Sequence, residues 1–149
     1  MPDELPGRSW RVMVVDDDPA SLLLTQEVLK LFGVHPCGTD SPEAAYAELQ
    51  RGTVDLIFMD VRMPGMNGLE LTVRIRDLEQ RLGRPRTPIV ALTANAMHDE
   101  QRACLMNGMD GVLTKPVPIQ SIKAALETWC APRPASWTGD ICVCNNAPL

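Results

Sequence analysis

Short apolar runs alternate with amphipathic segments along most of this chain. Residues 12–15, 56–59 and 89–92 are runs of four apolar residues, too short for buried helices and including β-branched side chains. Runs of this kind are typical of strands covered on both faces in a parallel sheet. Weaker strand signals lie at residues 34–37 and 111–114. The pattern therefore predicts five strands.

Helical patterns occupy the intervals between these runs. Leu24, Val28 and Leu31 recur at helical spacing and predict a helix over residues 19–32 with this stripe as its apolar face. Ser41 predicts the start of a second helix, because it is a good cap and a proline and an acid follow it. Three more helices are expected at residues 69–82, 97–107 and 118–129. A strand followed by a helix, five times over, predicts the α/β class: a doubly wound five-stranded parallel sheet with helices on both faces.

Composition and charge narrow the class of protein. The chain has 149 residues, with 14 Lys and Arg against 19 Asp and Glu and a formal net charge of −5. This charge argues against direct binding of nucleic acid, which favours a basic face. The sequence has neither an apolar run near the roughly 18 residues of a membrane helix nor a signal-peptide pattern. Five scattered cysteines do not indicate a disulfide framework, and we expect a cytoplasmic protein without membrane contact.

The periodic patterns divide the chain into three parts. Residues 10–130 carry all of the strand and helix signals and are expected to form one folded domain. Residues 1–9 are expected to be a disordered lead-in. Residues 131–149 show no periodicity and are rich in Pro, Gly and small polar residues, which predicts a flexible tail.

Side chains suited to chemistry follow four of the predicted strands. They are Asp16, Asp17, Asp60, Thr93 and Lys115. Ligands of open α/β sheets bind at the carboxyl ends of strands, near the point where the strand order reverses, so we expect these side chains in one pocket. Converging carboxylates repel one another, and a divalent cation lowers that cost. Mg²⁺ suits such a site because it prefers oxygen ligands and keeps waters that a substrate can displace.

The same residue types are sufficient for phosphoryl transfer. A carboxylate that faces the open side of the pocket can attack phosphorus and form an acyl phosphate. The reaction needs in-line positioning and neutralisation of charge, which a metal ion, a lysine and a hydroxyl group can supply.

Four segments give the chain a resemblance to the response-regulator receiver domain of two-component signalling. They are Val-Val-Asp-Asp at 14–17, Met-Asp-Val-Arg-Met-Pro-Gly-Met-Asn-Gly at 59–68, Leu-Thr-Ala at 92–94 and Leu-Thr-Lys-Pro at 113–116. Each is weak alone, but all four occur in order and at strand ends. The similarity covers about residues 10–130 and implies the (βα)5 flavodoxin-like fold. Residues 104–111 are most similar to receivers of hybrid sensor kinases.

The resemblance implies a magnesium site built from four residues. Asp17 and Asp60 would bind Mg²⁺ directly. The backbone carbonyl of Arg62 would assist them, and Asp16 would act mainly through water. Mg²⁺ is the one cofactor implied.

The resemblance also assigns the phosphoryl chemistry. Asp60 would accept the phosphoryl group from phosphohistidine. Thr93 would hydrogen-bond the phosphoryl oxygens, and Lys115 would pair with them. Arg62 and Asn95 occupy places that tune the lifetime of the phosphoryl group in such domains.

A signalling role follows from the same resemblance. The domain would not be an enzyme acting on a separate substrate, although it would catalyse its own phosphotransfer and dephosphorylation. Its partner would be a histidine kinase or a histidine phosphotransfer protein, with a phosphorylation-dependent homodimer as a further option. Phosphorylation would switch these protein–protein interactions.

Two alternatives remain open, the first because of a departure from the family pattern and the second because Asp16 and Asp18 form an Asp-x-Asp pattern after the first strand. Receivers often carry Tyr or Phe three residues before the lysine, where this chain has Val112. The first alternative is therefore a receiver-shaped docking module whose binding is independent of phosphorylation. The second is a small phosphatase of the haloacid-dehalogenase type, with Asp16 as nucleophile and Asp18 as acid. This second alternative leaves the loop after Asp60 unexplained.

Overall fold

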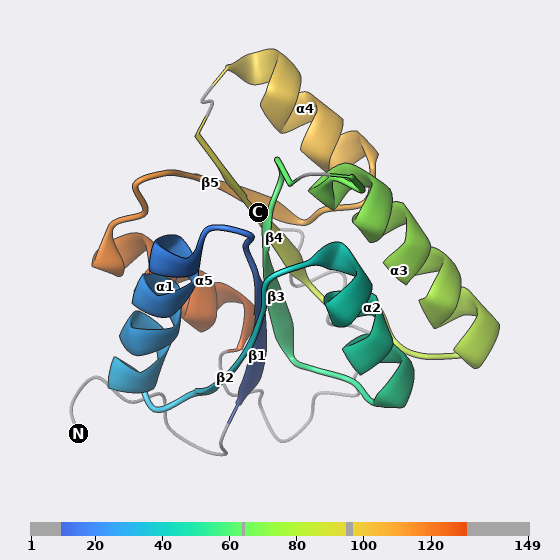
Figure 1. The fold of residues 1–149 in the computed structure, drawn as a ribbon, viewed down its shortest axis with the longest axis horizontal. Coiled ribbons are helices and arrows are strands. Elements are labelled where there is room, and N and C mark those ends of the chain that lie inside the picture. The colour runs from blue at the N-terminus through green and yellow to red at the C-terminus, as the bar shows by residue number, and fades with distance from the viewer. Residues whose placement is uncertain (1–9, 64, 95–96, 131–149) are drawn as a thin grey trace.

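The computed structural model describes residues 10–63, 65–94 and 97–130, over which five strands alternate with five helices (Figure 1). The strands are β1 (Arg11–Val15), β2 (His35–Thr39), β3 (Leu56–Asp60), β4 (Ile89–Thr93) and β5 (Gly111–Thr114). The helices are α1 (Pro19–Leu31), α2 (Pro42–Arg51), α3 (Gly68–Leu82), α4 (His98–Met106) and α5 (Ile119–Trp129). The five predicted strands and five predicted helices are confirmed, with ends that shift by one or two residues. The lead-in 1–9 and the tail 131–149 lie outside the described residues, and the domain boundaries at 10 and 130 stay predictions.

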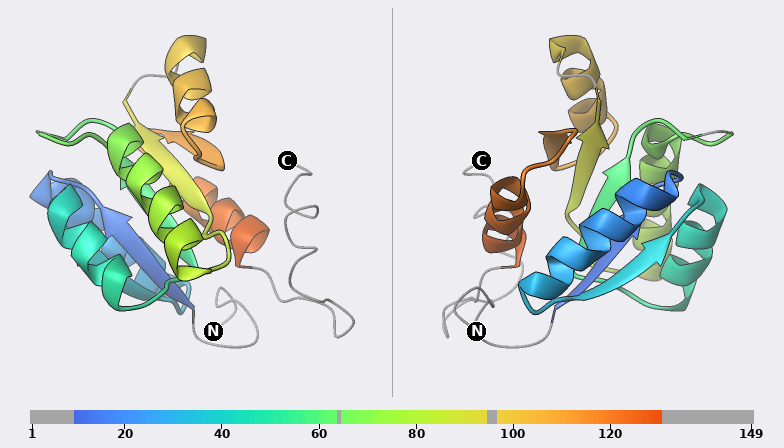
Figure 2. Two further views of the ribbon diagram at one scale, coloured as in Figure 1. Left: turned by 90° about the vertical axis from the view of Figure 1, so that its right-hand side faces the viewer. Right: turned by 60° about the vertical axis from the view of Figure 1, so that its left-hand side comes forward.

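The strands form one parallel sheet in the order β2-β1-β3-β4-β5. The chain runs outward from β1 to β2, returns past β1 to β3, and continues through β4 to β5. The strand order therefore reverses between β1 and β3. Helices α1 and α5 cover one face of the sheet, and α2, α3 and α4 lie on the other (Figures 1 and 2). This arrangement confirms the doubly wound α/β fold.

The central strands are apolar without interruption because both of their faces are covered. Val12 and Val14 of β1 join the core cluster beneath α1 and α5. Met13 and Val15, which alternate with them, join the cluster beneath α2 and α3. Strands β3 and β4 divide their side chains in the same way, and all five residues of each are buried. Burial on both faces accounts for the four-residue apolar runs of the sequence.

The predicted apolar face of α1 is wrong. Leu24 is 64% exposed and Leu31 is also exposed, whereas the buried residues of this helix are Thr25, Val28 and Leu29. Leucines lie all around this short helix, so two different stripes have helical spacing and periodicity alone cannot choose between them. The helix turns its 25–28–29 face to the sheet and leaves Leu24 in solvent.

The connection between β3 and α3 is fixed tightly to the end of β3. Asn67 caps α3, its side chain accepting from the backbone N–H of Glu70 at 2.9 Å while Glu70 accepts from the N–H of Asn67 at 3.1 Å. The N–H of Gly68 donates to the carbonyl oxygen of Val61 at 2.9 Å. A Cβ atom at Gly68 would collide with the backbone oxygen of Asp60. Only glycine lets α3 begin this close to the carboxyl end of β3.

We predict that Gly68→Ala destabilises the fold by about 1–3 kcal/mol, the usual cost of forcing an extra methyl group against packed backbone. Urea unfolding followed by circular dichroism measures this difference. Gly52→Ala is the matched control, because a Cβ atom at Gly52 meets nothing within 4 Å and the backbone there is extended. The control should stay within about 0.5 kcal/mol of the parent. Equal stability of the two variants would contradict the prediction.

Candidate functional site

Four strand ends bring the predicted site residues to one edge of the sheet. Asp16 follows β1 directly, Asp60 ends β3, Thr93 ends β4 and Lys115 follows β5. These strands are consecutive neighbours in the sheet. The site therefore lies across the point where the strand order reverses, at the carboxyl ends of β1 and β3.

Three carboxylates converge there. Asp16, Asp17 and Asp60 each offer an oxygen atom, and these atoms all lie within 4.8 Å of one another. Asp16 is completely buried, Asp60 is 7% exposed and Asp17 is exposed. Such a set of hard oxygen donors, open to water on the side of Asp17, fits Mg²⁺ with some of its water shell retained. The described residues thus contain the acidic cluster that the sequence analysis predicted.

Lys115 stands between the two buried carboxylates. Its Nζ atom lies 3.1 Å from Oδ2 of Asp16 and 3.6 Å from Oδ2 of Asp60. Burial lowers the pKa of Lys115, but the hydrogen bond to Asp16 and the charges of both carboxylates outweigh it, so the pKa lies above its ordinary value. The lysine is therefore firmly cationic and offsets part of the repulsion between the acids.

The carboxylate of Asp60 is costly to ionise. Burial is the main cause that raises its pKa, from 3.8 to about 6. The charge of Asp16 raises it further, while the charge of Lys115 opposes both effects. The N–H of Arg62 also favours the charged form, since it approaches Oδ1 of Asp60 at 3.4 Å. At neutral pH the group is ionised but poorly stabilised, which favours association with a cation.

Thr93 and Arg62 are joined through a residue that the sequence analysis did not single out. The hydroxyl of Thr93 donates to Oε2 of Glu100, near the start of α4. Oε1 of the same carboxylate accepts from Arg62 at 2.8 Å. An acid in the first turn of a helix is an ordinary stabilising feature, so its position in the sequence gave no signal of a link to the site.

The predicted roles of two residues, Arg62 and Asn95, stay predictions. The side chain of Arg62 is exposed and is directed to Glu100, while the predicted role of its backbone carbonyl as a metal ligand stays a prediction. Asn95 lies outside the described residues. Val112, which stands at the usual aromatic position, is half-buried and packs against the core cluster beneath α2 and α3.

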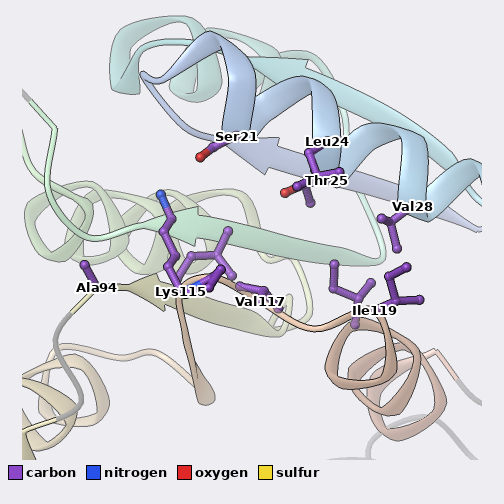
Figure 3. A pocket seen from close by; sticks show the side chains of 11 residues that line it. Ser21, Leu24, Thr25, Val28, Ala94, Lys115, Val117 and Ile119 are labelled. Carbon is purple, nitrogen blue, oxygen red and sulfur yellow. The ribbon is translucent and has the colours of Figure 1, made fainter.

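An apolar cavity opens beside Lys115. It has a volume of about 400 Å³ and is lined by side chains of α1, the segment after β5 and the start of α5. In Figure 3, Ser21, Leu24 and Thr25 of α1 face Lys115 and Val117 across this space. Leu24 extends the apolar surface to the outside of the molecule. A partner that reaches the acidic cluster from this side would meet an apolar surface first.

The fold and the acidic cluster define a small flavodoxin-like α/β domain whose site lies at the reversal of strand order. The family profile described as the response regulator receiver domain matches residues 12–127. The chain therefore belongs to the response regulator receiver domain family of two-component signalling.

A relative that matches this chain is a much longer signalling protein. The chain is 45% identical over 130 residues to the sensor histidine kinase GacS of Pseudomonas protegens, a match that covers 86% of this chain and 14% of GacS. The chain thus spans about a seventh of that relative's length.

Solved structures show the same fold. A chain in the co-crystal structure of the Saccharomyces cerevisiae histidine phosphotransfer signaling protein Ypd1 with the receiver domain of Ssk1 is 26% identical, with a TM-score of 0.77 and coverage of 81% of this chain and 88% of that chain. The receiver domain of the sensor histidine kinase PA1611 from Pseudomonas aeruginosa, solved with a magnesium ion in its active-site cleft, is 30% identical. Its TM-score is 0.73, with coverage of 82% of this chain and 98% of that chain. Among the described helices, none has the length and apolar character needed to span a bilayer.

We predict that Asp60→Asn stabilises the metal-free protein at neutral pH. The pKa of Asp60 is about 6 in the folded state and 3.8 ordinarily, so ionisation costs folding free energy. This cost is absent below pH 4, grows between pH 4 and 6, and is complete above pH 6. In EDTA at pH 7.5 the free energy of unfolding should rise by about 1–3 kcal/mol in the variant.

Urea unfolding at pH 4 and at pH 7.5 measures the effect. The gain should disappear near pH 4, where the parent is already protonated at this position. Asp40→Asn, at an exposed position, controls for the general loss of one negative charge. A variant that is less stable than the parent at pH 7.5 would show that Asp60 is stabilised in its charged form.

Proposed function

We propose that this receiver domain accepts a phosphoryl group from phosphohistidine onto Asp60, in a reaction that depends on Mg²⁺. The observation that carries the proposal is the acidic cluster of Asp16, Asp17 and Asp60 with Lys115 between two of its members. A cluster of this kind can hold a cation and a phosphoryl group together, because it offers both negative ligands and a fixed positive charge.

The proposed metal site uses the residues that the family resemblance implies. Asp17, Asp60 and the backbone carbonyl of Arg62 would hold Mg²⁺, and Asp16 would act through a water molecule. The bound ion would supply neutralisation of the charge on the phosphoryl oxygens. Its presence would also offset the cost of the ionised Asp60 carboxylate, whose pKa of about 6 reflects burial.

In the proposed reaction an oxygen of Asp60 attacks the phosphorus atom of phosphohistidine. An O–P bond forms, the P–N bond breaks, and its electron pair stays on the imidazole nitrogen, which takes up a proton. Lys115 is placed to pair with the transferred group, since it is half-buried, cationic and 3.6 Å from the Asp60 carboxylate. The hydroxyl group of Thr93 would donate a hydrogen bond to a phosphoryl oxygen. The carboxylate is mostly ionised at neutral pH, as a nucleophile must be.

The contacts favour Asp60 over Asp16 as the nucleophile. The contacts of Asp16 are the closer ones: its Oδ1 accepts from the N–H of Asp18 at 3.0 Å and its Oδ2 from Lys115 at 3.1 Å. The corresponding contacts of the two Asp60 oxygens are 3.4 and 3.6 Å. Asp16 is also completely buried, whereas Asp60 retains some exposure. Asp18 caps α1 by accepting from the N–H of Ser21, which leaves it poorly placed to be the acid of a phosphatase. The phosphatase alternative is therefore less well supported.

We predict that acetyl phosphate and Mg²⁺ add one phosphoryl group to the chain and that Asp60→Asn removes this labelling. The physical reason is that an amide oxygen cannot form the acyl phosphate. Intact-mass spectrometry detects the adduct, with EDTA as the control for the metal and Asp40→Asn as the control for charge. Labelling of the Asp60→Asn variant at the parent level would contradict the assignment. Sustained hydrolysis of phosphate esters that is lost in Asp16→Asn alone would favour the phosphatase.

The proposed donor is a histidine kinase or a histidine phosphotransfer protein. The similar structure that contains Ypd1 and the Ssk1 receiver supports this class of partner. On this chain the exposed Leu24 and Ile119 line the cavity beside Lys115. We place the donor on this apolar surface, because it adjoins the acceptor site and large exposed apolar side chains indicate contact with a partner.

We predict that Leu24→Glu slows phosphotransfer from a phosphotransfer protein that labels the parent by roughly tenfold or more, as loss of a buried leucine contact implies. Labelling by acetyl phosphate should be unchanged, because this small donor needs no protein contact. Leu82→Glu, an exposed leucine at the end of α3, is the matched control. Equal slowing of both donors would place Leu24 in the chemistry or the fold instead of the docking surface.

We propose that phosphorylation switches protein–protein contacts of the domain in the cytoplasm, without direct contact to nucleic acid or membrane. A phosphorylation-dependent homodimer is one form of output. The docking-module alternative, in which binding ignores phosphorylation, rests on Val112 at the usual aromatic position. Partner binding that is equal before and after labelling would favour that alternative.

A further inference from the structure

Glu100 connects three parts of the molecule that lie at the site. It stands in the first turn of α4, and its side chain is only 14% exposed. One oxygen accepts a hydrogen bond from the hydroxyl group of Thr93 at the end of β4. The other accepts from the guanidinium group of Arg62, two residues after Asp60, at 2.8 Å. The carboxylate thus ties α4 to both strands that flank the proposed phosphoryl site.

This contact conflicts with the proposed role of Thr93. A hydroxyl group carries one proton and can donate a full hydrogen bond to one acceptor at a time. In the structure that acceptor is Glu100, whereas in the phosphorylated state it would be a phosphoryl oxygen. A phosphoryl group also adds roughly 1.5–2 negative charges close to the Glu100 carboxylate. Both effects disfavour the Thr93–Glu100 hydrogen bond after phosphorylation.

We propose that Glu100 is a positioning residue that holds Thr93 in the unphosphorylated arrangement, and that phosphorylation of Asp60 releases Glu100 and loosens the first turn of α4. The inference rests on the proposed function, because it requires a phosphoryl group on Asp60. A groove of about 510 Å³ lies between the β3–α3 connection and Glu100, and it gives the released side chain room to move.

This connection supplies a route to α4 that does not need an aromatic side chain at position 112. Val112 is too short to follow a movement of Thr93 as a large ring would. Glu100 contacts Thr93 directly and is itself part of α4, so loss of one hydrogen bond changes the restraint on that helix. The signal would then pass through a competition between two acceptors for one donor.

The experiment compares Glu100→Gln with Asp99→Asn in the full chain. The first variant keeps the shape of the side chain but removes its charge, which weakens the tie to Thr93. The second removes an exposed acid from the same turn of α4. With acetyl phosphate and Mg²⁺, Glu100→Gln should be labelled roughly three- to tenfold faster than the parent, as expected when a charge-assisted hydrogen bond becomes a neutral one. Asp99→Asn should stay within about twofold, as a surface charge does.

Two further measurements separate positioning from a merely structural role. In the parent, phosphorylation should speed hydrogen exchange of the backbone amides at the start of α4. In Glu100→Gln exchange there should already be fast, and phosphorylation should not change it. In a Thr93→Ala background, Glu100→Gln should produce no additional change in labelling rate, because the contact is already absent.

The outcomes distinguish this inference from the proposed function. If the parent is labelled but Glu100→Gln is labelled at the same rate, with the same phosphorylation-dependent exchange in α4, the role of Glu100 is wrong and Asp60 remains the acceptor. Independent effects of Thr93→Ala and Glu100→Gln on the labelling rate would also overturn it. Failure of the parent to form any adduct would overturn the proposed function, and this inference with it.

Discussion

The burial of clustered carboxylates is the constraint on which the rest of the site depends. Asp16 and Asp60 are buried within a few ångströms of each other, an arrangement that is unfavourable without compensation. The charge of Lys115 opposes the repulsion from Asp16, and the pKa of Asp60 is still raised because burial of its carboxylate outweighs that attraction. The remaining cost makes the pocket receptive to a cation. It also means that affinity for a cation and stability of the metal-free fold oppose each other, since any change that makes the ionised acids less costly also lowers the gain from binding a cation.

The sheet stays folded despite the cost of the buried acids, because the acids lie only at the strand ends. The central strands are buried on both faces, and their apolar side chains divide between two core clusters. Asp60 is the last residue of β3, and the chain is held there by the close approach of Gly68 and the capping box of α3. The acids therefore cannot move apart by local rearrangement of the backbone. The fold holds them at a separation that a flexible loop would not maintain.

The sequence is sufficient to predict the three central strands and the residues at their ends. Burial on both faces leaves an apolar run in each of these strands, and a polar residue marks its end. The sequence does not predict which side of α1 is buried, since Leu24 and Leu29 are equally apolar and only packing against the sheet selects Leu29. It also does not reveal Glu100. The link from this residue to Thr93 joins two elements, β4 and α4, and depends on where the helix lies in space, which no local spacing encodes.

The proposed chemistry and the proposed output use different parts of this domain. Asp60, Thr93 and Lys115 lie at or just beyond strand ends, where the ladder of parallel strands fixes their relative positions. The groups that would sense the reaction lie outside that ladder, on α4 and in the β3–α3 connection. Val112 packs against the core cluster beneath α2 and α3 and is not part of the acidic cluster. Such a fold can keep one phosphoryl-transfer site while the contacts that report on it differ from one chain to the next.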